Sequence, residues 1–515
     1  MKKLASKSSL GRVQSFSMLQ TRSGKLFLCS MLLGILANVL FFDRNLGLSY
    51  PIFVLAFYGI FLWNTQSTVE KNFAGFLMIP VVLLSLTYLI FSNKVFYAIN
   101  FIAIPILIVM QTTWSANKAR GAWSPYHAIG DLFLGFLYRP FVFMALPLQL
   151  ISKKLSQGMG TKKESNFFKI TIGILVAVPL VAVIVALLAS ADQIFNSMVD
   201  ALPNIFIHIP FETLIPRTIF STVITLLSFS YIWSLMRKPK IKRIVFEDRD
   251  HVVSLRSSLD QVISSTLLSM INAIYVLFTL IQFSYLFGGF SFALPAEFTY
   301  AQYARRGFFE LVLVTLINFS ILLLLIYCTK KGTTRMNRMM QALETLLVFC
   351  TLIMLVSAFV RMYLYEQMYG YTYLRVFTHA FMIFLFVLVM FTLVRIWNGR
   401  MNLFKCYVLT GITALVLINF TTIDAFITKW NIDRYEHTGK IDIGYLTELS
   451  DDAVPGMIRL LHAKDDQIAG PIENYLYERK QELNKMDWQS FNFSSYHAKR
   501  LLSQEKLHYD KSYDY

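Results

Sequence analysis

The chain has 515 residues, of which 56% are hydrophobic and only 15% are charged. Soluble domains carry about 25% charged residues, so this composition excludes an ordinary soluble protein and indicates a membrane protein. The formal net charge is +17, but the basic residues fall in short loops between apolar runs. That distribution is typical of membrane topology and argues against nucleic-acid binding.

The chain begins with a polar, basic segment, residues 1–25, which we interpret as cytoplasmic. No small-residue cleavage site follows the first apolar run, so we expect no cleaved signal peptide. Crossing the hydrocarbon core takes about 20 residues. On that criterion, the next part of the chain predicts four spans, at residues 26–42, 48–63, 73–91 and 95–114.

Residues 115–168 form a long basic loop that contains an apolar stretch, residues 129–151. Polar residues and prolines interrupt this stretch, namely Asp131, Arg139, Pro140 and Pro147. We therefore interpret it as an interfacial or re-entrant helix in a cytoplasmic loop. If it crossed the membrane instead, every later loop would change side.

Seven further apolar runs predict spans, which makes eleven in total: 169–190, 213–236, 262–287, 307–328, 341–360, 375–397 and 404–423. With a cytoplasmic N-terminus, the inner segments carry 28 Lys and Arg and the outer loops carry six. This bias is what the positive-inside rule predicts. The fold class is therefore an all-α polytopic helix bundle over residues 26–423. An odd number of spans places the remaining tail outside the cell.

The tail, residues 424–515, is polar and mixed in charge, and we expect a small extracytoplasmic helical region. Gly470-Pro471 predicts the start of a helix, with proline at its first position. Helical spacing then predicts an apolar face formed by Ile472, Tyr475, Leu476, Leu483 and Met486. The four cysteines (Cys29, Cys328, Cys350 and Cys406) lie outside this tail, so we expect free thiols.

Charged residues gather at the predicted outer ends of three consecutive spans. Consecutive helices tend to be neighbours, so these residues could form one arginine-rich pocket. Guanidinium groups bind phosphate or carboxylate through paired hydrogen bonds, which suits an anionic or lipid-like ligand. The simpler interpretation, which we favour, is that they form ion pairs and interface anchors. The candidate residues are Arg305, Arg306, Glu310, Arg361, Glu366, Arg375 and His379.

Few polar residues lie within the predicted spans. We expect Asn272 and Asn318 to bond neighbouring helices, and Glu344 to reach an interface. An ion path usually shows several acids at mid-depth, so this pattern argues against an ion-coupled transporter. After the last span, Asp424, Asp451 and Asp452 belong to a polar junction. We considered a cation or sugar site there, but favour helix caps and surface salt bridges.

Motifs for nucleotide binding, serine hydrolysis and zinc binding are absent from the sequence, so we predict no catalytic residue, metal or cofactor. Asp43 lies where membrane glycosyltransferases carry acids in their first outer loop. That position supports one alternative, a membrane-embedded transferase acting on a lipid-linked substrate.

Four ordered motifs give a family resemblance: LLASADQIF (187–195), AQYARRGFFELV (301–312), RMYLYEQMYGYTYLR (361–375) and NIDRYEHTGKIDIGYLTELSDDAVP (431–455). Together they resemble bacterial membrane proteins of the domain-of-unknown-function 4153/4173 type, over roughly residues 30–500. The resemblance implies a bacterial polytopic inner-membrane protein. It carries over no catalytic or binding residue.

We therefore expect a non-enzymatic, multi-pass protein of the bacterial cell membrane. It would bind or transport an anionic or lipid-like molecule at the outer face, or sense the state of the envelope. Its predicted partners are the lipid bilayer, such a ligand, and another membrane protein.

Overall fold

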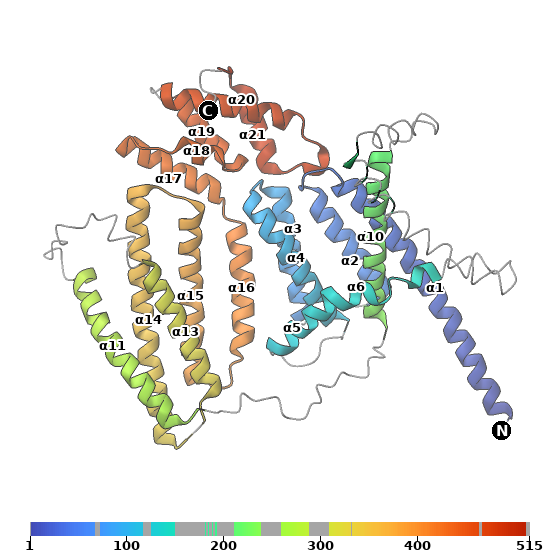
Figure 1. Ribbon diagram of the computed structural model, residues 1–515, viewed down its shortest axis with the longest axis horizontal. Coiled ribbons are helices and arrows are strands. Elements are labelled where there is room, and N and C mark those ends of the chain that lie inside the picture. The colour runs from blue at the N-terminus through green and yellow to red at the C-terminus, as the bar shows by residue number, and fades with distance from the viewer. Residues whose placement is uncertain are drawn as a thin grey trace. The chain divides into compact units, whose positions relative to one another are not determined.

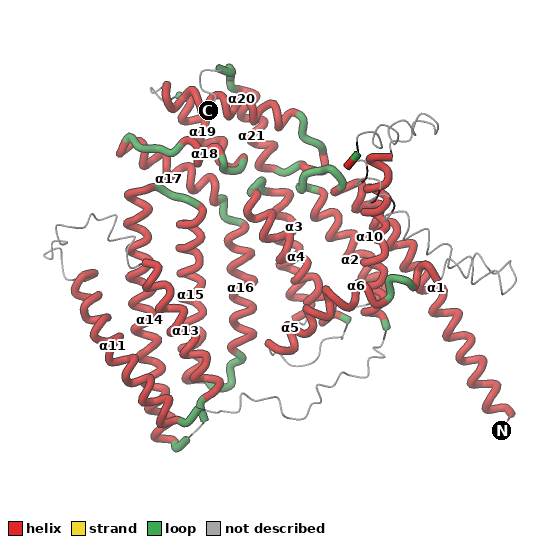
Figure 2. The backbone as a smooth tube through the Cα atoms, in the orientation of Figure 1, coloured by secondary structure: helices red, strands yellow, loops and turns green. Residues whose placement is uncertain are grey.

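The computed structural model describes residues 2–66, 73–116, 125–149, 211–237, 259–287, 308–330, 332–462 and 466–510, with single positions 181, 184, 188, 191 and 192. Within these residues the secondary structure is helical throughout (Figures 1 and 2). The sole β-type pairing in this part is an isolated bridge between Leu259 and Thr329. The predicted all-α fold is confirmed.

Eight helical stretches among the described residues are long and apolar enough to cross a membrane: Arg22–Phe41, Lys94–Ser115, Ala128–Gln149, Thr213–Met236, Gln261–Ile281, Phe308–Cys328, Thr334–Tyr369 and Tyr373–Trp397. Two shorter apolar helices, Ser49–Thr65 and Gly75–Ile90, match the predicted runs 48–63 and 73–91. Of the predicted span 169–190, the structure describes only positions 181, 184 and 188. The protein is therefore a polytopic helix bundle.

The chain divides into two compact units, which we describe separately. Unit 1 comprises residues 1–90, 97–240 and 486–492. Its elements are α1 (Lys2–Phe41), α2 (Ser49–Thr65), α3 (Phe73–Ile90), most of α4 (Lys94–Ser115), α5 (Pro125–Phe133), the π-helix η1 (Leu134–Tyr138), α6 (Arg139–Val142), α10 (Phe211–Met236) and the short 3₁₀-helix η4 (Trp488–Ser490).

Unit 1 is held by the close packing of α1 on α10. A Cβ atom at Gly34 would lie 2.4 Å from the Ser221 backbone oxygen, so only glycine permits this approach. At the end of α1, the segment 486–492 packs on the loop that leads into α2. There the Leu48 backbone N–H donates to the Phe491 carbonyl at 2.9 Å, and Arg44 pairs with Asp487.

The stretch predicted as interfacial, 129–151, is broken where its sequence suggested. The π-helix η1 covers 134–138, Pro140 lies in the first turn of α6, and a turn follows. The buried Arg139 guanidinium donates to the Thr113 hydroxyl at 2.8 Å. By length and composition Ala128–Gln149 counts among the candidate spans, so its interfacial placement stays a prediction.

Unit 2 comprises residues 91–96, 241–485 and 493–515. Its bundle contains α11 (Gln261–Phe287), α13 (Phe308–Cys328), α14 (Thr334–Tyr369), α15 (Tyr373–Trp397) and α16 (Leu403–Asn419). Apolar residues of α13, α14 and α15 form a shared core that includes Leu311, Met354 and Leu385. The three helices predicted to carry the arginine-rich pocket therefore do pack together.

The C-terminal helices of unit 2 follow a sharp bend. Helix α17 (Ile423–Thr438) turns by 58° from α16. It is followed by α18 (Ile443–Thr447), the 3₁₀-helix η3 (Asp451–Ala453), α19 (Val454–Leu461), α20 (Asp466–Asn484) and α21 (Phe493–Gln504). Figure 1 shows α17 lying across the ends of α14 and α15 rather than along them. The chain thus leaves the bundle at Asn419.

The predicted helix start at Gly470-Pro471 is wrong, because α20 already begins at Asp466 and contains Pro471. Proline in the second turn removes a single intrahelical hydrogen bond, which the helix tolerates. The predicted apolar face is confirmed at its centre, since Ile472, Leu476 and Leu483 are all buried.

The two ends of the unit 2 bundle differ in charge. One end carries the α13–α14 and α15–α16 turns, which a bond from the Gln341 side chain to the Ile396 carbonyl (3.0 Å) ties together. Its described basic residues are Lys330, Arg335, Arg338, Arg395, Arg400 and Lys405. The C-terminal helices contact the opposite end, where α15 begins.

Candidate functional site

The structure describes five of the seven residues predicted to form an arginine-rich pocket. Arg305 and Arg306 lie outside the described residues. Glu310 is exposed in the first turn of α13, and Arg361 lies near the end of α14. The remaining three, Glu366, Arg375 and His379, make contacts at the α14–α15 turn, described next.

Glu366 and His379 join α14 to α15. The buried Glu366 carboxylate lies 3.1 Å from Nδ1 of His379, and Nε2 of the same ring lies 3.3 Å from the Phe359 carbonyl. Glu366 therefore pairs across helices. Both of these candidate residues serve an interhelical contact.

Arg375 closes the C-terminal end of α14. Its guanidinium donates to the Tyr369 carbonyl at 3.1 Å and to the Gly370 carbonyl, and it stacks over the Tyr365 ring at 4.6 Å. The last carbonyls of a helix lack intrahelical donors, and a cation there also suits the helix dipole. Arg375 thus stabilises the turn, and the guanidinium donors that do so are not available to bind a free anion.

The same turn is held by Asn431 of α17. The Asn431 amide accepts from the Tyr371 backbone N–H at 2.9 Å and donates to the Tyr371 carbonyl at 2.8 Å. Gly370 has φ +85°, and a Cβ atom on it would lie 2.5 Å from Asn431 Oδ1. Glycine is required both for this backbone conformation and for the close approach of α17.

Asp424, in the first turn of α17, is the centre of a buried polar network. Asp424 is buried, with only 1% of its surface exposed. One carboxylate oxygen accepts from the Tyr373 hydroxyl; the other accepts from the Asn93 amide at 2.9 Å and from Ser450. Asn93 precedes α4, Tyr373 begins α15, and Ser450 precedes η3. A single carboxylate therefore joins three parts of unit 2 that are distant in sequence.

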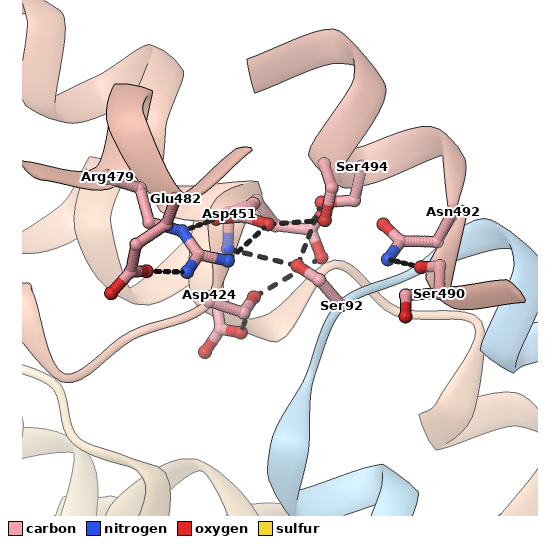
Figure 3. Close-up of polar contacts among 11 residues, drawn as sticks. Ser92, Asp424, Asp451, Arg479, Glu482, Ser490, Asn492 and Ser494 are labelled. Carbon is pink, nitrogen blue, oxygen red and sulfur yellow. Dashed lines mark hydrogen bonds and ion pairs between the residues drawn. The ribbon is translucent and has the colours of Figure 1, made fainter. Parts of the chain in front are cut away.

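Asp451 forms the second part of this network (Figure 3). It is 2% exposed, and its carboxylate receives two bonds from the Arg479 guanidinium, at 2.6 and 3.0 Å. Ser495 of α21 donates to it at 2.5 Å, and the Asp451 backbone N–H donates to Ser92 at 3.0 Å. A buried carboxylate needs such complete pairing, because an isolated charge is costly away from water.

Charge within this network shifts the ionisation of two side chains. Burial raises the pKa of Asp452 to about 6, and the neighbouring carboxylates of Asp424 and Asp451 add to that shift. Burial alone would lower the pKa of Arg479, but its bonds to Asp451 outweigh burial and raise it. Arg479 is therefore a permanent cation, whereas the raised pKa brings Asp452 closer to neutral pH than an ordinary aspartate.

The arrangement suits a mechanical joint better than a catalytic or metal centre. Both oxygens of Asp424 and both of Asp451 already accept hydrogen bonds within the protein. In the part of the chain that the structure describes, there is no group of three or more His, Cys, Asp or Glu side chains that could hold a metal ion. The favoured interpretation of caps and surface salt bridges was wrong for Asp424 and Asp451, which are buried. Asp442, which lies in the same polar junction, does cap α18 by accepting from the Tyr445 backbone N–H.

Two polar residues of the bundle behave as predicted. The Asn272 amide donates to the Leu343 carbonyl at 2.9 Å, and the Asn318 amide donates to the Thr351 hydroxyl at 3.1 Å. Both bonds connect neighbouring helices to α14.

Sequence reasoning missed Ser92, Asn93, Tyr373 and Arg479. Only Arg479 carried a signal. It lies at helical spacing from Ile472, Leu476 and Leu483, so it occupies the apolar face of α20, where a lone arginine requires a buried partner.

A protein-family model described as a domain of unknown function, DUF4153, matches residues 78–460. This range contains Asn93, Tyr373 and the three aspartates of the network, while Arg479 follows it. No curated protein and no solved structure matches the chain.

Proposed function

We propose that this chain, which belongs to the DUF4153 family, is a non-enzymatic sensor of envelope state. Its C-terminal helices would be the receiving part, on the outer side of the cell membrane. The observation that carries this proposal is the Asp424 carboxylate, which is shared by the bundle and the C-terminal helices.

The charge distribution of unit 2 supports the outer location. Six described basic residues lie at the end of the bundle opposite the C-terminal helices. Lys and Arg are retained preferentially in cytoplasmic loops. This favours an extracytoplasmic position for α17–α21.

The energetics of the joint support a switch between two states. Withdrawing the C-terminal helices from the bundle would take Asp424 away from the Tyr373 hydroxyl and the Asn93 amide, and each hydrogen bond to a charged group contributes about 1.5–3 kcal/mol. Intermediate positions are therefore unfavourable, and docking is close to all-or-none. A sensor needs such a bistable element, which an external condition can bias by a few kcal/mol.

The alternatives receive less support. Binding or transport of an anionic ligand would use arginines, but Arg375 is engaged by the α14–α15 turn. A transferase would need an outward acid. Asp43, the residue that suggested this alternative, is exposed, but the carboxylates of the network, Asp424 and Asp451, are buried and fully paired. Sensing requires neither a cavity nor a free carboxylate.

A complementation experiment tests the proposal. In a bacterial strain lacking the gene, the transcriptional response to acid, chelator and cell-wall antibiotics would be compared after returning the wild-type chain, Asp451→Asn or Arg459→Ala. Arg459 pairs with Glu436 at 3.1 Å on the surface, so it provides a matched arginine–carboxylate control.

We expect Asp451→Asn to insert normally but to fix the response on or off, whereas Arg459→Ala responds as wild type. The proposal would be overturned if Asp451→Asn restored a graded, wild-type response. It would also be overturned if the defect of the deletion strain were a loss of uptake of a nutrient rather than a loss of response.

A further inference from the structure

Helix α17 has a buried face and an exposed face that differ in chemistry along its length. In its first two turns the exposed face carries Phe426, Lys429 and Trp430, and the two aromatic residues are 43% and 40% exposed. The opposite face is buried through Ile423, Asp424, Ile427, Thr428, Asn431 and Ile432. The helix is thus anchored on one side and presents large aromatic groups on the other.

These aromatic residues form one cluster with the α14–α15 turn. The Tyr371 ring lies 5.7 Å from the Phe426 ring and 5.8 Å from the Trp430 ring, while Phe426 and Trp430 are 6.0 Å apart. Because Asn431 fixes the Tyr371 backbone, the cluster is held at a defined position at the end of the two spans.

The exposed cluster adjoins an apolar surface at the end of two candidate spans. The last turns of α14 and the first turn of α15 expose large apolar or aromatic side chains: Tyr363, Leu364, Met368, Tyr369 and Leu374. The Arg434 guanidinium donates to the Met368 carbonyl at 3.2 Å, so α17 adjoins this surface directly. An exposed apolar surface thus runs from the ends of α14 and α15 to the aromatic residues of α17.

The second half of α17 has the opposite character. Asp433 and Glu436 are acidic, and both lie near Arg459 of α19, at 4.0 and 3.1 Å. Two turns of aromatic residues and one lysine thus give way to two turns of paired charges. This gradient is what a helix shows when it leaves the membrane interface for water.

We infer that the first two turns of α17 lie in the phospholipid headgroup layer, with Phe426 and Trp430 at the boundary of the acyl chains and Lys429 reaching a lipid phosphate. Tryptophan and tyrosine favour this layer because their rings are amphipathic, and a lysine side chain extends toward the headgroups. The inference requires only that α14 and α15 span the membrane, so it is independent of the proposed sensing role.

Site-specific photocrosslinking tests this placement in the otherwise unaltered chain. The variants are Lys429→p-benzoylphenylalanine, His437→p-benzoylphenylalanine and Arg500→p-benzoylphenylalanine, each in nanodiscs of phosphatidylcholine and phosphatidylglycerol. His437 is exposed a little over two turns later on α17, and Arg500 is exposed on α21. The three exposed positions differ in their expected distance from the headgroups.

After illumination, mass spectrometry counts the phospholipid adducts on each peptide. Interfacial helices are immersed about 5–10 Å in the headgroup boundary, so we expect position 429 to give adducts at least about fivefold above positions 437 and 500. Equal yields at all three positions would overturn the inference. So would crosslinks from 429 to a second copy of the chain, because the cluster would then be a protein interface.

Discussion

Replacing Arg479 by alanine gives the most direct test of the buried network. The change leaves the Asp451 carboxylate, 2% exposed, without its cation. Removing one partner of a buried pair costs about 3–5 kcal/mol. The Arg479 side chain is itself 26% exposed, so water partly replaces it, and we expect the lower end of that range, about 3 kcal/mol.

A loss of this size measurably raises the population of the state in which α20 is detached from η3. Because 1.4 kcal/mol corresponds to a factor of ten, about 3 kcal/mol raises the open population by about a hundredfold. Hydrogen exchange of the backbone amides in α19, α20 and α21, measured in nanodiscs, reports this opening. The matched control is Arg459→Ala, which removes an exposed ion pair worth about 0.2–1 kcal/mol and should accelerate exchange by less than about fivefold.

The reasoning fails if the two arginine variants accelerate exchange equally. A double-mutant cycle with Asp451→Asn and Arg479→Ala gives a second check, since the two changes should be strongly non-additive when the side chains act as one pair. Additive effects would show that the bidentate contact contributes no coupling energy.

Three further outcomes are expected. Burial raises the pKa of Asp452 to about 6. Between about pH 4 and 6 the folded protein therefore keeps a proton that the unfolded chain releases. The free energy of unfolding should fall as pH rises through that window. Asp452→Asn should flatten this dependence and raise the melting temperature at pH 7, and thermal unfolding at pH 4.5 and 7 measures both. Gly370→Ala should destabilise the protein by about 1–3 kcal/mol more than Gly439→Ala. Both glycines have positive φ, but only Gly370 has close neighbours where a Cβ atom would lie. Equal melting temperatures of the two variants would contradict this. Arg375→Ala should lower the melting temperature without changing the retention of phosphatidylglycerol, whereas lost lipid with unchanged stability would restore the arginine-pocket hypothesis.

The sequence was sufficient to predict the helices but not their polar contacts. Apolar runs of adequate length identify spans because the bilayer imposes its thickness on them, and ten of the eleven predicted runs coincide with helices. Interhelical bonds from Asn272 and Asn318 were also predictable, since an isolated amide in an apolar helix needs a partner.

The site was not predictable in the same way, because its residues are brought together by tertiary packing. Asn93 and Asp424 are 331 positions apart, and neither has a local pattern that indicates the other. Arg375 was correctly placed at the end of a span, but its partners are backbone carbonyls, which leave no trace in sequence. The buried aspartates were misread as surface groups because short polar stretches usually are exposed.

Helix α14 has 36 residues and no internal proline or glycine, so at 1.5 Å per residue it is about 54 Å long, against a hydrocarbon core of about 30 Å. It therefore protrudes well beyond the hydrocarbon as one stiff rod. The Gly370 turn that α17 clamps is one tip of that rod, and the other tip begins at Thr334 beside the basic turn. If α14 tilts about a point inside the bilayer, a displacement of the clamped end moves the opposite end in the opposite direction. No diffusing ligand and no moving loop is needed to connect the two ends.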